Sequence, residues 1–309
     1  MTILSTVAGI ALIALALLDI FTVLLRPGAQ SRLSGALARA VWSLLRHAGT
    51  DRRNILSLAG PLAVTAVICF WAVAQVTGWA LIYLPHYPHD YALAEGTEAH
   101  RPIVGALHAS LTTVTTLGST NVAPKPGWLQ VVGPVQAMIG FGMLSAAVAW
   151  LLQLYPVLSR RRALAYEIHL LVDTERHLGV EVPDLEESVA AQLYGELTSR
   201  LIGVERDLVK FPITYYFAES EPRFALAAAM PALAELAERG TSGECPPPVR
   251  LRAAMLQEAT HDFARTVSER FVLHRRHREG DALEAFARDH RHAADGSPAD
   301  AQRAAAPGA

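Results

Sequence analysis

Long apolar runs alternate with charged or polar segments in the first half of the chain, whereas the second half is rich in Arg, Glu, His and Ala. A helix needs about 20 apolar residues to cross the hydrocarbon core of a bilayer. Three runs are long enough, at residues 3–25, 55–84 and 128–155. The pattern therefore predicts three membrane-spanning helices in a membrane domain of residues 1–157.

The first run is also compatible with a cleaved signal peptide. We favour a retained helix because residues 3–25 lack a positively charged start and a clear small-residue cleavage site. Asp19 is the one charged residue in this run. An ionisable group in hydrocarbon is costly, so we expect Asp19 to have a structural role, paired with an arginine or a polar backbone group. A sensing or gating role is the alternative.

Charge in the connecting loops predicts the orientation. Residues 26–56 carry six arginines against one aspartate, residues 85–101 carry three acidic residues against one arginine, and Arg160, Arg161 and Arg162 follow the third run. Basic residues concentrate on the cytoplasmic side. We therefore expect the N-terminus outside and the C-terminal half in the cytoplasm.

Apolar residues recur at helical spacing within residues 33–45, with arginines between them. This pattern predicts an amphipathic helix. Such a helix either lies in the membrane interface, in contact with lipid, or packs on the cytoplasmic domain.

Residues 102–124 interrupt the apolar pattern between the second and third runs. They begin with the proline-led, helix-compatible stretch PIVGALHASLTTV at 102–114, and the polar sequence TTVTTLGSTNVAP occupies 112–124. The segment is too short to cross and return as two helices. Irregular backbone at membrane depth is tolerated only where it is buried in protein or lines water. We therefore predict a re-entrant helix followed by an extended strand on an aqueous path.

Such a strand can direct its carbonyl oxygens at a common axis and replace the hydration shell of a cation. Alternating backbone conformations, some with positive φ, are needed for this, and a glycine such as Gly118 permits positive φ at little cost. The negative end of the short helix dipole also favours a cation. A single loop cannot enclose an ion, so several chains must share the axis. The alternative is a re-entrant loop that packs and conducts nothing.

The order span, short helix, threonine-rich loop, span over about residues 55–157 resembles the potassium-channel pore family. The filter consensus of that family is Thr-Val-Gly-Tyr-Gly-Asp, and the matching positions here are Thr116, Leu117, Gly118, Ser119, Thr120 and Asn121. Thr112 and Thr115 match the supporting positions of the pore helix, and Pro124 follows the filter. Gly140 and Gly142 lie mid-span, where the family often has a hinge; close helix packing is the other interpretation.

The resemblance implies a homotetramer in the bacterial plasma membrane, with potassium or another monovalent cation at Thr116, Leu117, Gly118 and Ser119, and no organic cofactor. The Tyr-Gly pair of the family is replaced by Ser119 and Thr120, so we expect potassium selectivity to be reduced. The alternative function is a non-conducting membrane scaffold or sensor that uses a degenerate channel fold.

Beyond the third run, residues 158–279 predict a helical cytoplasmic domain, and residues 280–309 predict a disordered tail. Residues 162–178 continue the third span as helix. Asp184 and Glu187 form a capping-box pattern at the start of a helix whose apolar stripe is Val189, Leu193, Leu197, Leu201, Val204 and Leu208. The fold class expected from the whole chain is all-α.

Composition argues against several classes of partner and site. A formal net charge of −2 gives no reason to expect nucleic acid as a partner. The two cysteines, Cys69 and Cys245, form no zinc or disulfide pattern. Because we find no nucleophile, base or metal constellation, we do not expect an enzyme.

Overall fold

The structure is a computed structural model that describes residues 2–26, 31–47, 56–93, 101–118, 122–271 and 279–290. The predicted filter positions Ser119, Thr120 and Asn121 lie outside the described residues, as does residue range 291–309. The chain divides into two compact units. Unit 1 comprises residues 1–41 and 62–153, and unit 2 comprises residues 42–61 and 154–309.

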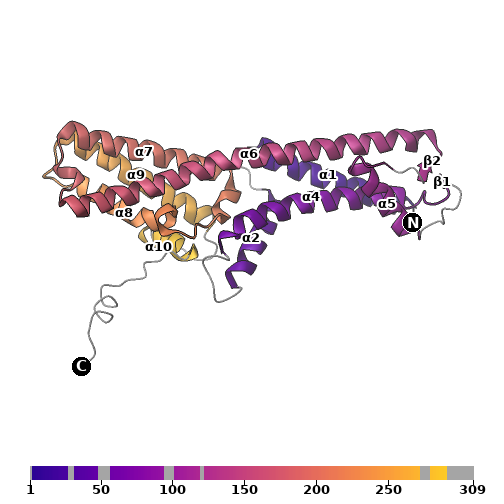
Figure 1. The fold of residues 1–309 in the computed structure, drawn as a ribbon, viewed down its shortest axis with the longest axis horizontal. Helices are drawn as coiled ribbons and strands as arrows, with labels where there is room; N and C mark the ends of the chain where they lie inside the picture. The colour runs from indigo at the N-terminus through magenta and orange to yellow at the C-terminus, as the bar shows by residue number, and fades with distance from the viewer. Residues whose placement is uncertain are drawn as a thin grey trace, which may run out of the picture. The chain divides into compact units, whose positions relative to one another are not determined.

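Three helices of the described chain are long and apolar enough to cross a membrane. They are α1 (Thr2–Leu25), α4 (Ala59–Tyr83) and α6 (Gly127–Leu178) (Figure 1). The three predicted spans are therefore confirmed as helices. Helix α6 continues without a break past the predicted end of the third span, and its residues contribute to both units.

Small residues bring α1 and α4 together within unit 1. A Cβ atom on Gly9 would lie 2.5 Å from the carbonyl oxygen of Gly78, and one on Gly78 would lie 3.0 Å from the carbonyl oxygen of Gly9. Close approach through glycine is how apolar helices gain packing contacts where lipid offers no hydrophobic driving force.

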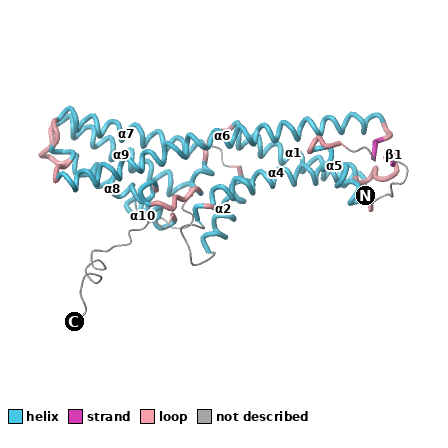
Figure 2. The backbone as a smooth tube through the Cα atoms, in the orientation of Figure 1, coloured by secondary structure: helices cyan, strands magenta, loops and turns pink. Residues whose placement is uncertain are grey.

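Helix α2 (Arg32–His47) forms where the amphipathic pattern predicts a helix, and it contributes residues to both units. Helix α5 (Pro102–Val114) has the bounds expected for the short helix, with its proline in the first turn. Strands β1 (Tyr91–Leu93) and β2 (Val122–Pro124) form a small antiparallel sheet on either side of α5 in the sequence (Figure 2). The all-α expectation missed this sheet, because three-residue strands leave too short a pattern to detect.

Unit 2 is helical. It contains α7 (Glu187–Lys210), α8 (Leu226–Gly240), α9 (Pro247–Arg270) and α10 (Glu279–Asp289), with α7 and α9 side by side (Figure 1). Helix α10 corrects the prediction of a disordered tail from residue 280. Its apolar residues Ala282, Phe286 and Ala287 are buried, so a helix with little overall hydropathy is held by contacts distant in the sequence.

Two details of the α7 prediction are wrong. Asp184 belongs to a 3-10 turn (Val182–Asp184), and α7 starts at Glu187 without a side-chain capping hydrogen bond. Val189 is exposed, and the buried stripe instead starts at Ala190 and Tyr194. The Tyr194 hydroxyl donates to the Leu236 carbonyl oxygen at 3.1 Å, which explains how a tyrosine occupies the core position.

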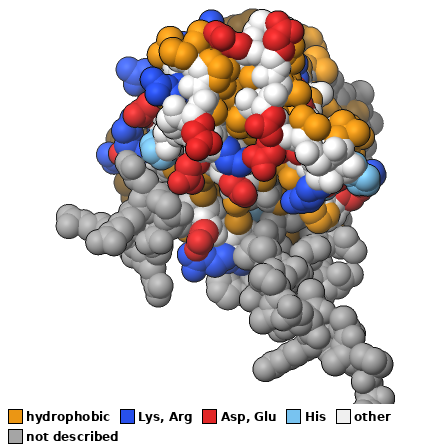
Figure 3. All heavy atoms as spheres, turned by 90° about the vertical axis from the view of Figure 1, so that its left-hand side faces the viewer, with side chains coloured by type: hydrophobic (Ala, Val, Ile, Leu, Met, Phe, Trp, Pro, Cys, Tyr) orange, Lys and Arg blue, Asp and Glu red, His pale blue; other side chains and the backbone are white. Residues whose placement is uncertain are grey.

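The arginines that follow the third predicted span are engaged within unit 2. Arg161 is buried and donates to the carbonyl oxygens of Thr214 and Phe217. Arg160 pairs with Asp207 at 2.7 Å. On the face of unit 2 shown in Figure 3, acidic, basic and apolar side chains are interspersed. Such mixing is ordinary for a protein surface in contact with water.

Candidate ion-binding loop and its supports

The backbone after α5 turns sharply and stays tied to the helix. The amide of Thr116 donates to the Thr113 carbonyl oxygen, and the amide of Gly118 donates to the Thr112 carbonyl oxygen, both at 3.0 Å. The φ angle is +57° at Thr116 and +73° at Gly118, while Leu117 between them has no positive φ. The left-handed Thr116 and these hydrogen bonds end α5 in a tight turn, and Gly118 repeats the left-handed φ two residues later.

Positive φ at Thr116 was not predicted. A left-handed conformation costs an L-residue with a Cβ atom roughly 1–2 kcal/mol, and Thr116 is the one non-glycine residue in the described chain that adopts it. Backbone strain of this kind concentrates at functional positions. The sequence gives no local signal for it, because a threonine ordinarily indicates the opposite preference.

The threonine hydroxyls divide into two groups. Thr112, Thr113 and Thr115 each donate back to a carbonyl oxygen of α5, at 2.8, 2.7 and 2.7 Å in their shortest contacts. The Leu111 carbonyl also accepts from the Thr115 amide at 3.1 Å, so the Thr115 hydroxyl adds a second hydrogen bond to a carbonyl that already has a backbone partner. The side chains of Thr116 and Leu117 are exposed, Leu117 by 79%. Thr112 and Thr115 thus shape the helix end, whereas Thr116 faces outward.

A buried polar network holds α5 in place. Ser110 Oγ donates to the Val76 carbonyl oxygen of α4 at 2.8 Å. Gln136 Nε2 of α6 lies 3.0 Å from both the carbonyl oxygen and Oγ of Ser110, and Tyr83 donates to Gln136 Oε1 at 2.6 Å. All the side chains are buried. Because polar groups in an apolar setting must find partners, the network joins three helices in one register.

Gly140 provides the second support. A Cβ atom at Gly140 would lie 2.6 Å from the carbonyl oxygen of Val114, the last residue of α5. Gly142 has open space instead, with nothing within 4 Å of its Cβ position. The two glycines that the sequence grouped as a hinge therefore differ: Gly140 is a packing contact under the short helix, and α6 is unbroken at both positions.

A groove of about 440 Å³ lies beside the loop. The residues that line it include Thr113, Gly118, Tyr83, Leu129 and Gly133. All belong to unit 1.

Asp19 has partners, but not those predicted. Its carboxylate accepts hydrogen bonds from the hydroxyls of Ser31 and Ser34, at the start of α2, and from Trp71 Nε1 at 2.8 Å. Asp19 is buried. The structural role is supported, while the arginine or backbone partner is replaced by three neutral side-chain donors.

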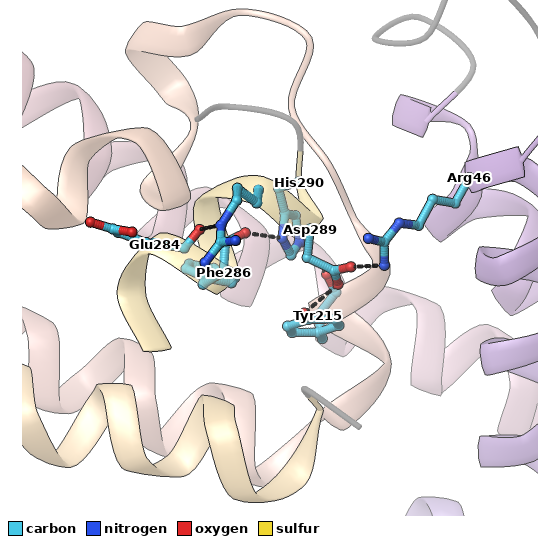
Figure 4. A network of polar contacts seen from close by, with 7 residues as sticks. Arg46, Tyr215, Glu284, Phe286, Asp289 and His290 are labelled. Carbon is cyan, nitrogen blue, oxygen red and sulfur yellow. Dashed lines mark hydrogen bonds and ion pairs between the residues drawn. The ribbon is translucent and has the colours of Figure 1, made fainter. Parts of the chain in front are cut away.

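Another carboxylate with several partners lies in unit 2, and the sequence analysis did not identify it. Asp289, at the end of α10, forms an ion pair with Arg46 of α2 and accepts a hydrogen bond from the Tyr215 hydroxyl at 2.6 Å (Figure 4). Burial and the adjacent Asp289 carboxylate raise the pKa of Tyr215 well above its ordinary value. The phenol therefore remains a donor across the whole physiological range.

His290 sits next to this pair with both ring nitrogens near carbonyl oxygens. Nε2 lies 2.8 Å from the Tyr215 carbonyl and Nδ1 lies 3.1 Å from that of Phe286. Burial lowers the pKa of His290 to about 4, against the opposing effects of Asp289 and the two carbonyls. A neutral ring donates one proton, and we assign it to the shorter contact with Tyr215.

The described residues contain no group of three His, Cys, Asp or Glu side chains placed to hold a metal ion. A cation at the loop would therefore depend on carbonyl and hydroxyl oxygens, which are the ligands that hard monovalent cations accept.

These features define a helical membrane protein. The chain is 23% identical over 225 residues to the uncharacterized membrane protein YdjJ of Bacillus subtilis (strain 168), and this match covers 70% of the chain and 63% of YdjJ. The chain thus spans less than two thirds of the relative's length. No family model matches the sequence. No solved structure matches it either.

Proposed function

We propose that the chain assembles as a homotetramer in the bacterial plasma membrane and conducts monovalent cations, as a pore of the potassium-channel type. In this proposal α5 is a re-entrant pore helix, the loop after it is the inner part of the filter, and α6 lines the path. The resemblance of residues 55–157 to that family motivates it.

The observation that carries the proposal is the alternating backbone at Thr116 and Gly118, at the end of a short helix between two long apolar helices. An ion that leaves water must receive oxygen ligands of comparable number and strength. In a ring of four chains, the carbonyls of Thr116 and Leu117 would supply them, with the Thr116 hydroxyl at the inner end. The carbonyl end of α5 adds a favourable dipole.

The surface of α6 agrees with a shared axis. Several large apolar side chains of its unit 1 segment are exposed, among them Val131, Met138, Phe141, Leu144 and Leu152. The groove beside the loop and the 79% exposed Leu117 also lack a cover among the residues that the structure describes. Neighbouring copies of the same chain would cover these surfaces in a tetramer.

Selectivity depends on the outer filter, where Ser119 and Thr120 replace the Tyr-Gly pair of the family. We propose that potassium selectivity is reduced, because threonine resists the positive φ needed to direct a carbonyl to the axis. With fewer sites in series at which an ion is dehydrated, the free-energy cost for a sodium ion to enter the filter is smaller.

The test is recording from purified protein in planar bilayers, with potassium and sodium on opposite sides. The native chain is expected to pass cation current. Gly118→Ala should reduce the current strongly, because alanine at a φ of +73° adds a second strained residue beside Thr116 in each of the four copies. Gly203→Ala is the matched control, since Gly203 in α7 has nothing within 4 Å of its Cβ position.

The same recordings measure selectivity. Ser119→Tyr combined with Thr120→Gly should raise the potassium-to-sodium permeability ratio above that of the native chain, and Thr120→Gly alone should raise it partly. If the native chain excludes sodium as strongly as the double variant, the account of these residues is wrong. A stable tetramer that passes no current would favour the non-conducting scaffold or sensor instead.

We also propose that the N-terminus lies outside and unit 2 in the cytoplasm, from the distribution of arginines. Lys125 is exposed after β2, and the Arg176 side chain is 73% exposed near the end of α6. A cysteine at position 125 should react with an impermeant reagent on intact cells, and one at position 176 only after permeabilisation. The reverse pattern would contradict this topology.

A further inference from the structure

Helix α2 has a surface divided into three stripes. The first faces the protein and contains Ser31, Ser34, Ala38 and Trp42, all of them buried. Their spacing of three and four residues places them on one side of the helix. Within unit 1 this side is fixed by the hydrogen bonds from Ser31 and Ser34 to Asp19.

The opposite stripe is apolar and exposed. Leu33 and Leu44 are 44% and 72% exposed, and Ala36 and Ala40 between them are also exposed. A helix that faces water on this side would carry polar residues there. We therefore expect this apolar stripe to contact an apolar neighbour.

Arginines form the third stripe. Arg32, Arg39 and Arg46 recur every seven residues along the boundary between the buried and apolar sides. Arg46 pairs with Asp289. Arg32 and Arg39 form no salt bridge within the described chain, although carboxylates are plentiful elsewhere.

We propose that α2 lies in the surface of the bilayer, where its exposed leucines contact acyl chains and Arg32 and Arg39 bind the headgroups of anionic phospholipids. Guanidinium groups match phosphate oxygens in charge and in hydrogen-bond geometry. This inference rests on the membrane location alone and does not depend on conduction.

The depth of α2 argues for lipid as the occupant. Asp19 lies about 9 Å, nearly two helical turns, before the end of α1 at Leu25. Because Asp19 binds Ser31 and Ser34, the first turn of α2 lies level with the last turns of an apolar helix long enough to span a membrane. Acyl chains and headgroups are both present at that level, and they complement the two outer stripes of α2.

The first experiment measures contact with acyl chains. A fluorescent label on Leu33→Cys or Leu44→Cys should be quenched by brominated acyl chains after reconstitution into phosphatidylcholine and phosphatidylglycerol vesicles. A label on Leu251→Cys is the matched control, because Leu251 is a 64% exposed leucine on α9 in unit 2. Equal quenching at positions 44 and 251 would overturn the proposal.

The second experiment measures headgroup binding by native mass spectrometry, with phosphatidylglycerol and phosphatidylcholine as probes. Arg32→Gln and Arg39→Gln should each weaken retention of phosphatidylglycerol by about fivefold, the effect of one arginine at a membrane surface. Arg39→Lys should retain most of it, and the exposed α9 residue Arg250 provides the control Arg250→Gln. An unchanged preference for phosphatidylglycerol in the Arg32→Gln, Arg39→Gln double variant would contradict the assignment.

A second copy of the chain is the competing occupant. If the apolar stripe were a protein interface, Leu44→Cys would form disulfide-linked dimers in bilayers upon oxidation, and its label would be shielded from brominated lipid. Efficient dimer formation with no quenching would assign the stripe to another copy and overturn the lipid proposal.

Discussion

Asp19 and Asp289 are two carboxylates that hold the two ends of the same helix by different chemistry. Asp19 binds the first turn of α2 through Ser31 and Ser34 and also accepts from an indole. Asp289 binds the last turn through Arg46 and also accepts from a phenol. Each contact lies within one unit, the first in unit 1 and the second in unit 2.

The difference between them follows their surroundings. Asp19 belongs to a helix apolar enough to span a membrane, and its hydrogen-bond partners are the neutral donors Ser31, Ser34 and Trp71. Asp289 lies outside such segments, and its partner Arg46 has a 47% exposed side chain. A charge away from water depends on hydrogen bonds that cannot be replaced, whereas an exposed ion pair competes with water and salt. Losing Asp19 should therefore be more costly than losing Asp289.

The largest effect is expected for Asp19→Ala. The substitution leaves the buried donors of Ser31, Ser34 and Trp71 without an acceptor, at a cost of about 4 kcal/mol. Thermal unfolding in detergent, followed by fluorescence, should show a clearly lowered midpoint. Asp19→Asn keeps one acceptor oxygen, so its unfolding midpoint should lie between those of the native chain and Asp19→Ala. If both variants melt like the native chain, the hydrogen bonds to α2 contribute nothing to stability.

Asp289→Ala should destabilise the docking of α10 by about 3 kcal/mol, because Arg46 and the buried Tyr215 hydroxyl lose their shared acceptor. Hydrogen exchange in α10 should accelerate while exchange in α7 stays unchanged. Glu284→Ala is the control, because the Glu284 side chain is exposed on the same helix and only its backbone carbonyl accepts a hydrogen bond, from Arg288. Equal acceleration in both variants would show that the loss of any acidic side chain loosens α10.

Acidification should loosen the same helix by a smaller amount. The pKa of His290 falls from 6.5 to about 4 when α10 is docked, so the undocked form binds a proton more readily. Stability is then complete above pH 6.5 and declines as the pH falls toward 4, by about 2 kcal/mol at pH 5. His290→Gln should flatten this dependence in hydrogen exchange measured between pH 7 and pH 5. A dependence that survives the substitution would point to another group, with Asp289, Arg46 and Arg161 the charged groups nearest to His290.

The apolar runs predict the long helices well, because a span is a local property of about 20 residues. Helix α5 was also predicted from a local pattern, because a proline starts the apolar run at Pro102 and polar residues follow its end at Val114. The partners of Asp19 and the network of Ser110 and Gln136 were not predicted. They join residues far apart in the chain, and no local pattern records which helices meet.

The positive φ at Thr116 and helix α10 were missed for a related reason. Threonine disfavours the conformation that it adopts here, so only the tertiary fold imposes it. Residues 279–289 have the composition of a solvated segment, and their burial depends on Phe286 meeting Phe263 of α9, with ring centroids 5.8 Å apart. A sequence pattern reports the conformational propensity of each residue. At Thr116 and in α10, packing against residues distant in the sequence overrides that propensity.

The small sheet has a consequence for engineering. Leu93 pairs with Val122 and Tyr91 with Pro124, so the segment that holds α5 and the loop starts and ends at neighbouring backbone positions. A segment with adjacent ends can be exchanged as a cassette without stretching its host. The filter of a selective channel could therefore be transplanted between the two strands, provided that the incoming short helix keeps Ser110, which bonds the Val76 carbonyl of α4 and Gln136 of α6.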